Sequence, residues 1–166
     1  MKKVLLLILL MPILIKAQET PISAFLIKWE NSKNFLLEIA EAMPENKYDY
    51  KPTEKQLSFK KQLLHIQGNM NWLTSAYFKE ISLPKKPANN SKKALIAYVK
   101  ESFETVAAAL KDTPEESLET KVDFFAGPKT KLQILNLLQD HVTHHRGQLI
   151  VYLNLNNITP PKYTGW

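Results

Sequence analysis

The sequence contains no cysteine. A disulfide, a thiolate nucleophile, a zinc site with thiolate ligands and an N-terminal lipid attached through cysteine are therefore excluded. Any metal that this chain holds must be bound by nitrogen and oxygen ligands.

Basic charge is neither large nor concentrated. The 22 lysine and arginine residues exceed the 16 aspartate and glutamate residues, but Lys2, Lys3 and Lys16 lie in an N-terminal segment that we expect to be removed, which halves the excess. A nucleic-acid-binding surface needs a clustered basic footprint. We therefore predict no nucleic-acid partner.

No apolar run is long enough to span a membrane. Residues 1–17 contain a lysine pair and then about a dozen apolar residues interrupted by Pro12, whereas a spanning helix needs about 20. This pattern predicts a signal peptide over 1–17 and one folded domain over 18–166, located in the periplasm or secreted, without stable membrane insertion after cleavage. An uncleaved anchor is the alternative, because Ile15 and Lys16 make the cleavage site imperfect.

Four stretches carry apolar residues at helical spacing. They run from Pro21 to just before Pro44, from Ser58 to Tyr77, from Ser91 to Lys111 and from Thr130 to Leu155. No βαβ rhythm is present, so the sequence predicts an all-α four-helix bundle. The connection at 81–90 can extend to about 35–40 Å, enough to run back along a 20-residue helix, and this allows the second and third helices to be parallel.

Single aromatic, glycine and asparagine residues also predict local packing and a helix end. We expect Phe124 and Phe125 to close one end of the core, and Trp72 to be a core residue. Gly147 suggests close packing of the last helix. Asn156 and Asn157 can supply the left-handed residue that ends a helix, a position that is usually glycine.

The last predicted helix is apolar, yet it contains three of the four histidines. His141 and His145 lie on its apolar stripe, where bare imidazoles are costly. Residues four apart on a helix have Cβ atoms about 5–6 Å from each other, so the two rings can share one metal ion. His65 lies beside the apolar face of the second helix, where it can point toward another helix. These three residues form a candidate metal site.

Three neutral imidazoles on one divalent ion leave at least one position for water, as catalytic sites do. Zinc or nickel is expected first, while iron and manganese also accept imidazole. Val142 stands where the His-Glu-x-x-His motif has glutamate, which excludes the usual metalloprotease. A non-catalytic bundle that binds metal or a small ligand, and a purely structural bundle, remain as alternatives. No residue is identified as a general base.

Two neighbours of the histidine pair have less certain roles. His144 points about 100° away from His145 and follows Asp140 by four residues, so a surface ion pair is expected, with a second-sphere partner or a substitute ligand as the alternative. Arg146 is expected to be solvated or paired with a carboxylate, although beside a metal it could hold an anion.

Several motifs resemble the DinB/YfiT-like metalloenzyme family. They are Ser58-Phe59 followed by His65, the segment His141-Val-Thr-His-His-Arg-Gly-Gln-Leu149, Tyr152-Leu153 followed by Pro160-Pro161, and the stretch 43–52. The resemblance implies an up-down-down-up bundle with a long crossover between helices two and three, and a divalent metal held by His65, His141 and His145. It also implies that a homodimer can form. Since some relatives resemble thiol transferases and others are called hydrolases, it implies a hydrolase or a transferase acting on a small molecule.

Overall fold

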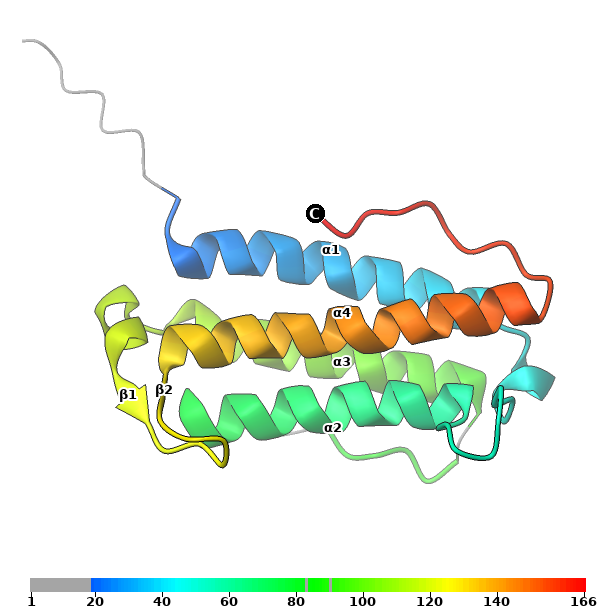
Figure 1. Ribbon diagram of the computed structural model, residues 1–166, viewed down its shortest axis with the longest axis horizontal. Helices are drawn as coiled ribbons and strands as arrows, with labels where there is room; N and C mark the ends of the chain where they lie inside the picture. The colour runs from blue at the N-terminus through cyan, green and yellow to red at the C-terminus, as the bar shows by residue number, and fades with distance from the viewer. Residues whose placement is uncertain (1–18, 83, 90) are drawn as a thin grey trace, which may run out of the picture.

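Four long α-helices make up most of the structure (Figure 1). The computed structural model describes residues 19–82, 84–89 and 91–166, so the predicted signal peptide at 1–17 lies outside the described residues. The helices are α1 (Pro21–Ala42), α2 (Phe59–Tyr77), α3 (Lys92–Lys111) and α4 (Lys131–Leu155). All four predicted helices are confirmed. Within the described ranges, no helix combines the length and apolar character needed to cross a membrane.

Short elements join the helices at the two ends of the bundle. The 3-10 helices η1 (Glu45–Lys47) and η2 (Glu115–Glu119) follow α1 and α3. Strands β1 (Lys121–Val122) and β2 (Lys129–Thr130) then pair antiparallel, and Gly127 has φ +89° in the turn between them. This hairpin leads directly into α4.

Side-chain hydroxyls fix the first turn of three helices. Thr20 and Thr130 each accept a hydrogen bond from the backbone N–H three residues later, and Ser91 accepts one from Ala94. These bonds satisfy amides that have no partner inside the helix. Ser58 occupies the same position before α2, but its hydroxyl is buried and makes no hydrogen bond. Asn157 has φ +57°, which confirms the predicted left-handed end of α4.

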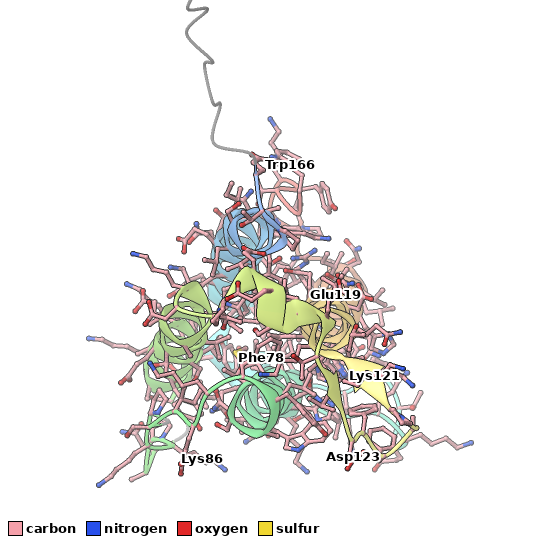
Figure 2. The ribbon with its side chains drawn as sticks, turned by 90° about the vertical axis from the view of Figure 1, so that its left-hand side faces the viewer. Phe78, Lys86, Glu119, Lys121, Asp123 and Trp166 are labelled. Atoms are coloured by element: carbon pink, nitrogen blue, oxygen red, sulfur yellow. The ribbon has the colours of Figure 1, made fainter. Side chains whose placement is uncertain are left out.

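The helices follow the up-down-down-up order implied by the family resemblance. In Figure 1, α1 and α4 run in one direction, whereas α2 and α3 run in the other. Each helix packs against two others: α1 contacts α3 and α4, and α2 also contacts α3 and α4. The end-on view in Figure 2 shows the same square arrangement around a central core. The topology therefore makes the two histidine-bearing helices, α2 and α4, antiparallel neighbours.

Large apolar side chains fill the space between the helices. Trp29, Phe35, Phe59 and Phe103 are all at most 1% exposed. The indole N–H of Trp29 donates to the backbone carbonyl of Phe103 at 3.1 Å, and the two rings lie 4.5 Å apart. This contact ties α1 to α3 in the centre of the bundle.

Two aromatic residues lie outside this core, contrary to prediction. Phe125 is 84% exposed and Trp72 is 44% exposed. Phe125 lies in the loop between β1 and β2, and Trp72 lies on the outward side of α2, where its ring packs against Phe124 and Phe125. Only Phe124 also packs against the buried cluster. The two phenylalanines therefore form a partly exposed aromatic surface with Trp72 instead of closing the core.

Candidate metal centre

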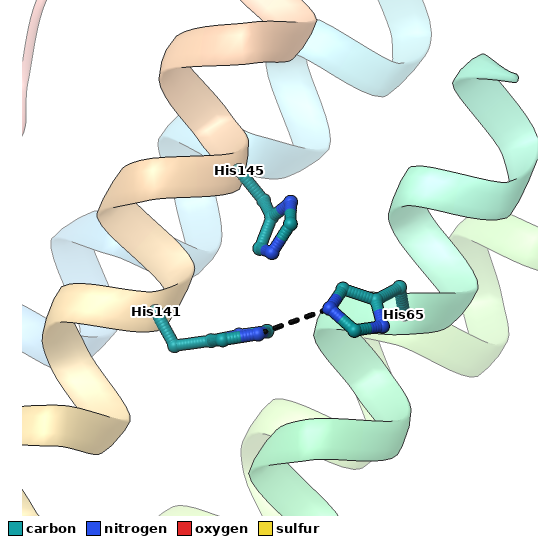
Figure 3. A group of neighbouring side chains, drawn as sticks. All are labelled: His65, His141 and His145. Carbon is teal, nitrogen blue, oxygen red and sulfur yellow. Dashed lines mark hydrogen bonds between the residues drawn. The ribbon is translucent and has the colours of Figure 1, made fainter. Parts of the chain in front are cut away.

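Three histidines from two helices come together at the boundary between α2 and α4 (Figure 3). The Nε2 atoms of His65 and His141 lie 3.1 Å apart. The ring of His145 lies 4.5 Å from that of His65 and 4.4 Å from that of His141. One ring nitrogen from each residue falls within 4.8 Å of the other two. The structure thus brings together the three residues that the sequence selected.

The spacing and chemistry of this group are compatible with a metal ion. Imidazole nitrogens bind zinc at about 2.0–2.1 Å, so two nitrogens on one ion lie about 3–3.4 Å apart. The 3.1 Å between His65 and His141 falls in this range. Within the described residues, the candidate ligand group contains three imidazoles and no carboxylate. It therefore suits a divalent metal that accepts nitrogen ligands.

A chain of hydrogen bonds sets the orientation of His145. The Tyr152 hydroxyl donates to the carbonyl of Leu57 at 2.9 Å and accepts from Gln62 Nε2 at 3.4 Å. This places Gln62 Oε1 at 2.7 Å from His145 Nδ1. Because an amide oxygen only accepts, Nδ1 carries the proton and Nε2 keeps its lone pair free. Hydrogen bonds of this kind orient metal-binding histidines and raise their basicity.

The other two histidines are held differently. The Nε2 atoms of His65 and His141 lie within hydrogen-bonding distance of each other, so one ring donates and the other accepts according to their tautomers. The Nδ1 atom of His141 is buried and has no hydrogen-bond partner. His65 is exposed, whereas His141 and His145 are partly buried. Solvent therefore reaches the cluster from the side of His65.

Burial keeps two of the imidazoles neutral. It lowers the pKa of His141 and of His145 from 6.5 to about 4, and the neighbouring histidines add to this effect because like charges repel. Both side chains are therefore unprotonated at pH 7. This is the form in which imidazole binds a metal.

The lowered pKa values predict how the stability of the metal-free protein depends on pH. Between about pH 6.5 and about pH 4 the unfolded chain binds more protons at His141 and His145 than the folded chain does. The free energy of unfolding should therefore fall as the pH is lowered through this range. Urea denaturation at pH 7 and at pH 5 measures the change. A double variant, His141→Asn with His145→Asn, should show a smaller difference between the two pH values.

Gln62 offers a test of the hydrogen-bond chain. Gln62→Leu keeps the approximate size of this buried side chain but removes the acceptor for His145. We expect the affinity for zinc to fall by about 10–100-fold, the range found when a partner of a metal-binding histidine is removed. Competition against a chromophoric chelator measures this loss. Gln67→Leu is the matched control, because Gln67 is similarly buried on α2 but makes no hydrogen bond to the histidines among the described residues. Equal losses in both variants would contradict a specific role for Gln62.

Sequence reasoning gave no role to Gln62 or Gln148, although it placed Gln62 on the same stripe of its helix as His65. Gln62 lies three residues before His65, and Gln148 lies three residues after His145, so each is about one helical turn from a histidine. Gln62 Nε2 also donates to Gln148 Oε1. Helical spacing places each glutamine near a histidine, but it could not show that the two glutamines meet across the boundary between α2 and α4.

His144 is connected to the same network and not to Asp140. Its Nε2 atom lies 2.9 Å from Gln148 Nε2, and its ring packs edge-on against His145 at 4.8 Å. No ion pair joins His144 to Asp140 among the described residues, so that expectation is wrong. The second-sphere alternative agrees better with these contacts.

Arg146 points toward α1, on the far side of α4 from the histidines. It is 3% exposed, Nη1 donates to the hydroxyl of Ser32 at 3.1 Å, and the guanidinium lies 5.1 Å from the centre of the Phe35 ring. A Cβ at Gly165 would lie 2.8 Å from Nη2, so glycine lets the C-terminal tail pass close to this side chain. The predicted solvated or carboxylate-paired role is therefore wrong, and Arg146 supports the fold. Gly147 is exposed and has open space around it, so the close packing expected there is also absent.

The fold and the histidine cluster together define a four-helix bundle with a candidate metal centre between α2 and α4. The family model described as "DinB family" matches residues 17–165. The chain belongs to the DinB family, as the motifs predicted.

Relatives from two Bacillus species support this assignment. The chain is 26% identical over 125 residues to the Bacillus subtilis (strain 168) protein YjoA, covering 73% of this chain and 81% of YjoA. The crystal structure of that DinB-like protein superimposes with a TM-score of 0.72 at 24% identity, covering 85% of this chain and 96% of the other. A DinB-like protein from Bacillus cereus ATCC 10987 also gives a TM-score of 0.72, at 20% identity, covering 84% and 95%. At these identities the structural likeness shows the fold alone.

Proposed function

We propose that this protein is a metal-dependent enzyme, a hydrolase or a transferase of a small molecule. His65, His141 and His145 hold the divalent ion, with zinc or nickel the first candidates and iron or manganese next. The proposal rests on one observation: three imidazole nitrogens lie within 4.8 Å of one another, and no carboxylate belongs to the group. Three nitrogen ligands leave at least one coordination position for water or substrate.

The surrounding residues prepare the cluster for this role. A divalent ion bound there would lower the pKa of a bound water and would polarise a carbonyl or phosphoryl oxygen. Gln62 fixes the proton of His145 on Nδ1, and burial keeps His141 and His145 neutral at pH 7. The exposed position of His65 gives a substrate access from solvent.

A binding module without catalysis is the second candidate. The absence of a carboxylate from the histidine group favours it, because no general base is provided there by the described residues. Such a module would hold its metal with every coordination position filled by a carboxylate or an amide. Since the group has no carboxylate, an amide would have to supply the remaining ligand. The two candidates therefore differ in whether an added ligand can reach the ion.

The cellular location and the assembly are part of the proposal. We place the mature protein in the periplasm or outside the cell, after removal of residues 1–17, and expect a homodimer. N-terminal sequencing of protein exported by a bacterial host tests the cleavage. Light scattering on the mature chain tests the dimer.

Cobalt substitution tests the function. Protein purified without an affinity tag should contain about one divalent ion per chain, as measured by elemental analysis. After exchange to Co²⁺, the visible spectrum should change when azide or a small thiol is added, because an exchangeable position accepts the ligand. A spectrum that stays unchanged at saturating azide favours the binding module. Purified protein that contains no metal and does not bind Zn²⁺ or Ni²⁺ contradicts both candidates.

A further inference from the structure

A pocket lies beside the histidine cluster, toward the C-terminal end of α4. It has a volume of about 380 Å³, and its walls include Pro52 from the segment before α2 and Gln148, Val151, Tyr152 and Leu155 from α4. Small-molecule sites usually have volumes of about 300–1,000 Å³. We call this cavity the α4 pocket.

The α4 pocket is continuous with the network that orients the metal centre. Two of its lining residues, Gln148 and Tyr152, receive hydrogen bonds from Gln62, and Gln62 accepts one from His145. At 1.5 Å per residue, Val151 lies only about 9 Å along the helix from His145. A small molecule bound to an ion at the cluster can therefore extend into the pocket.

Polarity changes in one direction along this surface of α4. His141, His145 and Gln148 present nitrogen and oxygen atoms, whereas Val151 and Leu155 beyond them are apolar. These two side chains are 50% and 56% exposed, so an apolar group that covered them would remove apolar surface from water. The surface thus matches a ligand with a polar head at the cluster and an apolar group beyond it.

The opposite end of the α2–α4 boundary is also apolar, and Trp72 there lines a larger pocket of about 580 Å³ that extends toward Tyr98 of α3. There, Trp72 and Phe125 stack with Phe124. These rings already contact one another, and no hydrogen bond connects them to Gln62 or to the histidines among the described residues. The aromatic surface at Trp72 is therefore the alternative site for the apolar part of a ligand, and Trp72→Ser tests it.

We propose that the α4 pocket binds the apolar part of the substrate. The substrate is then a small molecule in which a polar, metal-binding group carries an aliphatic or aromatic group of a few carbon atoms. This inference rests on the proposed function, because it takes the histidine cluster as the position of the polar group.

Two hydroxamic acids separate binding of the polar head at the histidine cluster from binding of the apolar group in the α4 pocket. Isothermal titration of the zinc-loaded chain would compare acetohydroxamic acid, which offers only the metal-binding head, with octanohydroxamic acid. One fully buried methylene contributes about a factor of four in affinity. We expect the eight-carbon acid to bind at least about tenfold more tightly, since burying two methylenes is sufficient.

Substitutions in the α4 pocket test whether the alkyl chain of octanohydroxamic acid binds there. The double variant Val151→Ser with Leu155→Ser should lose most of this gain and keep its affinity for acetohydroxamic acid. Ile27→Ser is the matched control, because Ile27 is 57% exposed on α1 and far from the pocket in the fold. All of these side chains are exposed, so thermal denaturation should show that the variants remain folded.

The outcomes distinguish this inference from the proposed function. If acetohydroxamic acid does not bind the zinc-loaded chain, the exchangeable position is absent and both proposals fail. If it binds but the longer acid binds no more tightly, the α4 pocket proposal fails and the proposed function stands. A gain that survives in the double variant, or that is lost in Trp72→Ser, also overturns the pocket proposal.

Discussion

Replacing His141 by alanine should lower the affinity for zinc by two orders of magnitude or more. The variant removes one of three nitrogens that lie within 4.8 Å of one another, and loss of a hydrogen-bond partner alone costs about 10–100-fold. The loss of a ligand should exceed that range. Competition against a chromophoric chelator at pH 7 measures the affinity, because both His141 and His145 are neutral at this pH.

His144→Ala provides the matched control for this experiment. His144 lies on the same helix and packs against His145, but it belongs to the hydrogen-bond network and not to the ligand group. Its removal should change the affinity for zinc by only a few-fold. Similar losses for His141→Ala and His144→Ala would show that His144 also binds the ion, which would contradict a ligand group of His65, His141 and His145 alone.

We expect Trp29→Ala to lower the free energy of unfolding by about 3–5 kcal/mol, as found for buried aromatic residues replaced by alanine. Trp29 is 1% exposed, contacts the rings of Phe25 and Phe103, and joins α1 to α3 through its indole N–H. The substitution leaves a cavity that the surrounding helices can only partly fill. Urea denaturation of the metal-free protein measures the loss.

Trp29→Phe separates packing from hydrogen bonding at this position. Phenylalanine fills most of the cavity but removes the indole hydrogen bond to the carbonyl of Phe103, which costs about 0.5–1.5 kcal/mol because that carbonyl lies inside α3 and keeps its helical partner. The loss should be smaller than for Trp29→Ala. If the alanine variant loses less than about 1 kcal/mol, Trp29 does not have the central packing role that the structure gives it.

The helices and the histidine cluster could be predicted because both depend on local periodicity. Thr20, Ser91 and Thr130 mark helix starts by their own hydroxyl chemistry. His141 and His145 are four residues apart, so they lie on one face of α4 whatever that helix packs against. His65 was selected as the one remaining histidine, and the antiparallel packing of α2 on α4 brings it to the pair.

Features that depend on contacts between distant segments could not be predicted in the same way. Nothing in the spacing of Arg146 indicates that Ser32 of α1 and the backbone at Gly165 will enclose it. The composition of α2 marks Trp72 as a core residue, but the position of the hairpin decides that it packs at the surface with Phe124. The role of Gln62 likewise depends on the hydroxyl of Tyr152, which lies 90 residues away in the sequence.

The position of the histidines along the chain has a consequence for chain entropy. His65 and His141 are 76 residues apart, and closing a flexible loop of that length costs on the order of 4 kcal/mol. The bundle closes this loop when α4 docks against α2. An ion that bound both histidines would act as a reversible cross-link between α2 and α4, and would oppose the separation of these two helices until a chelator removed it.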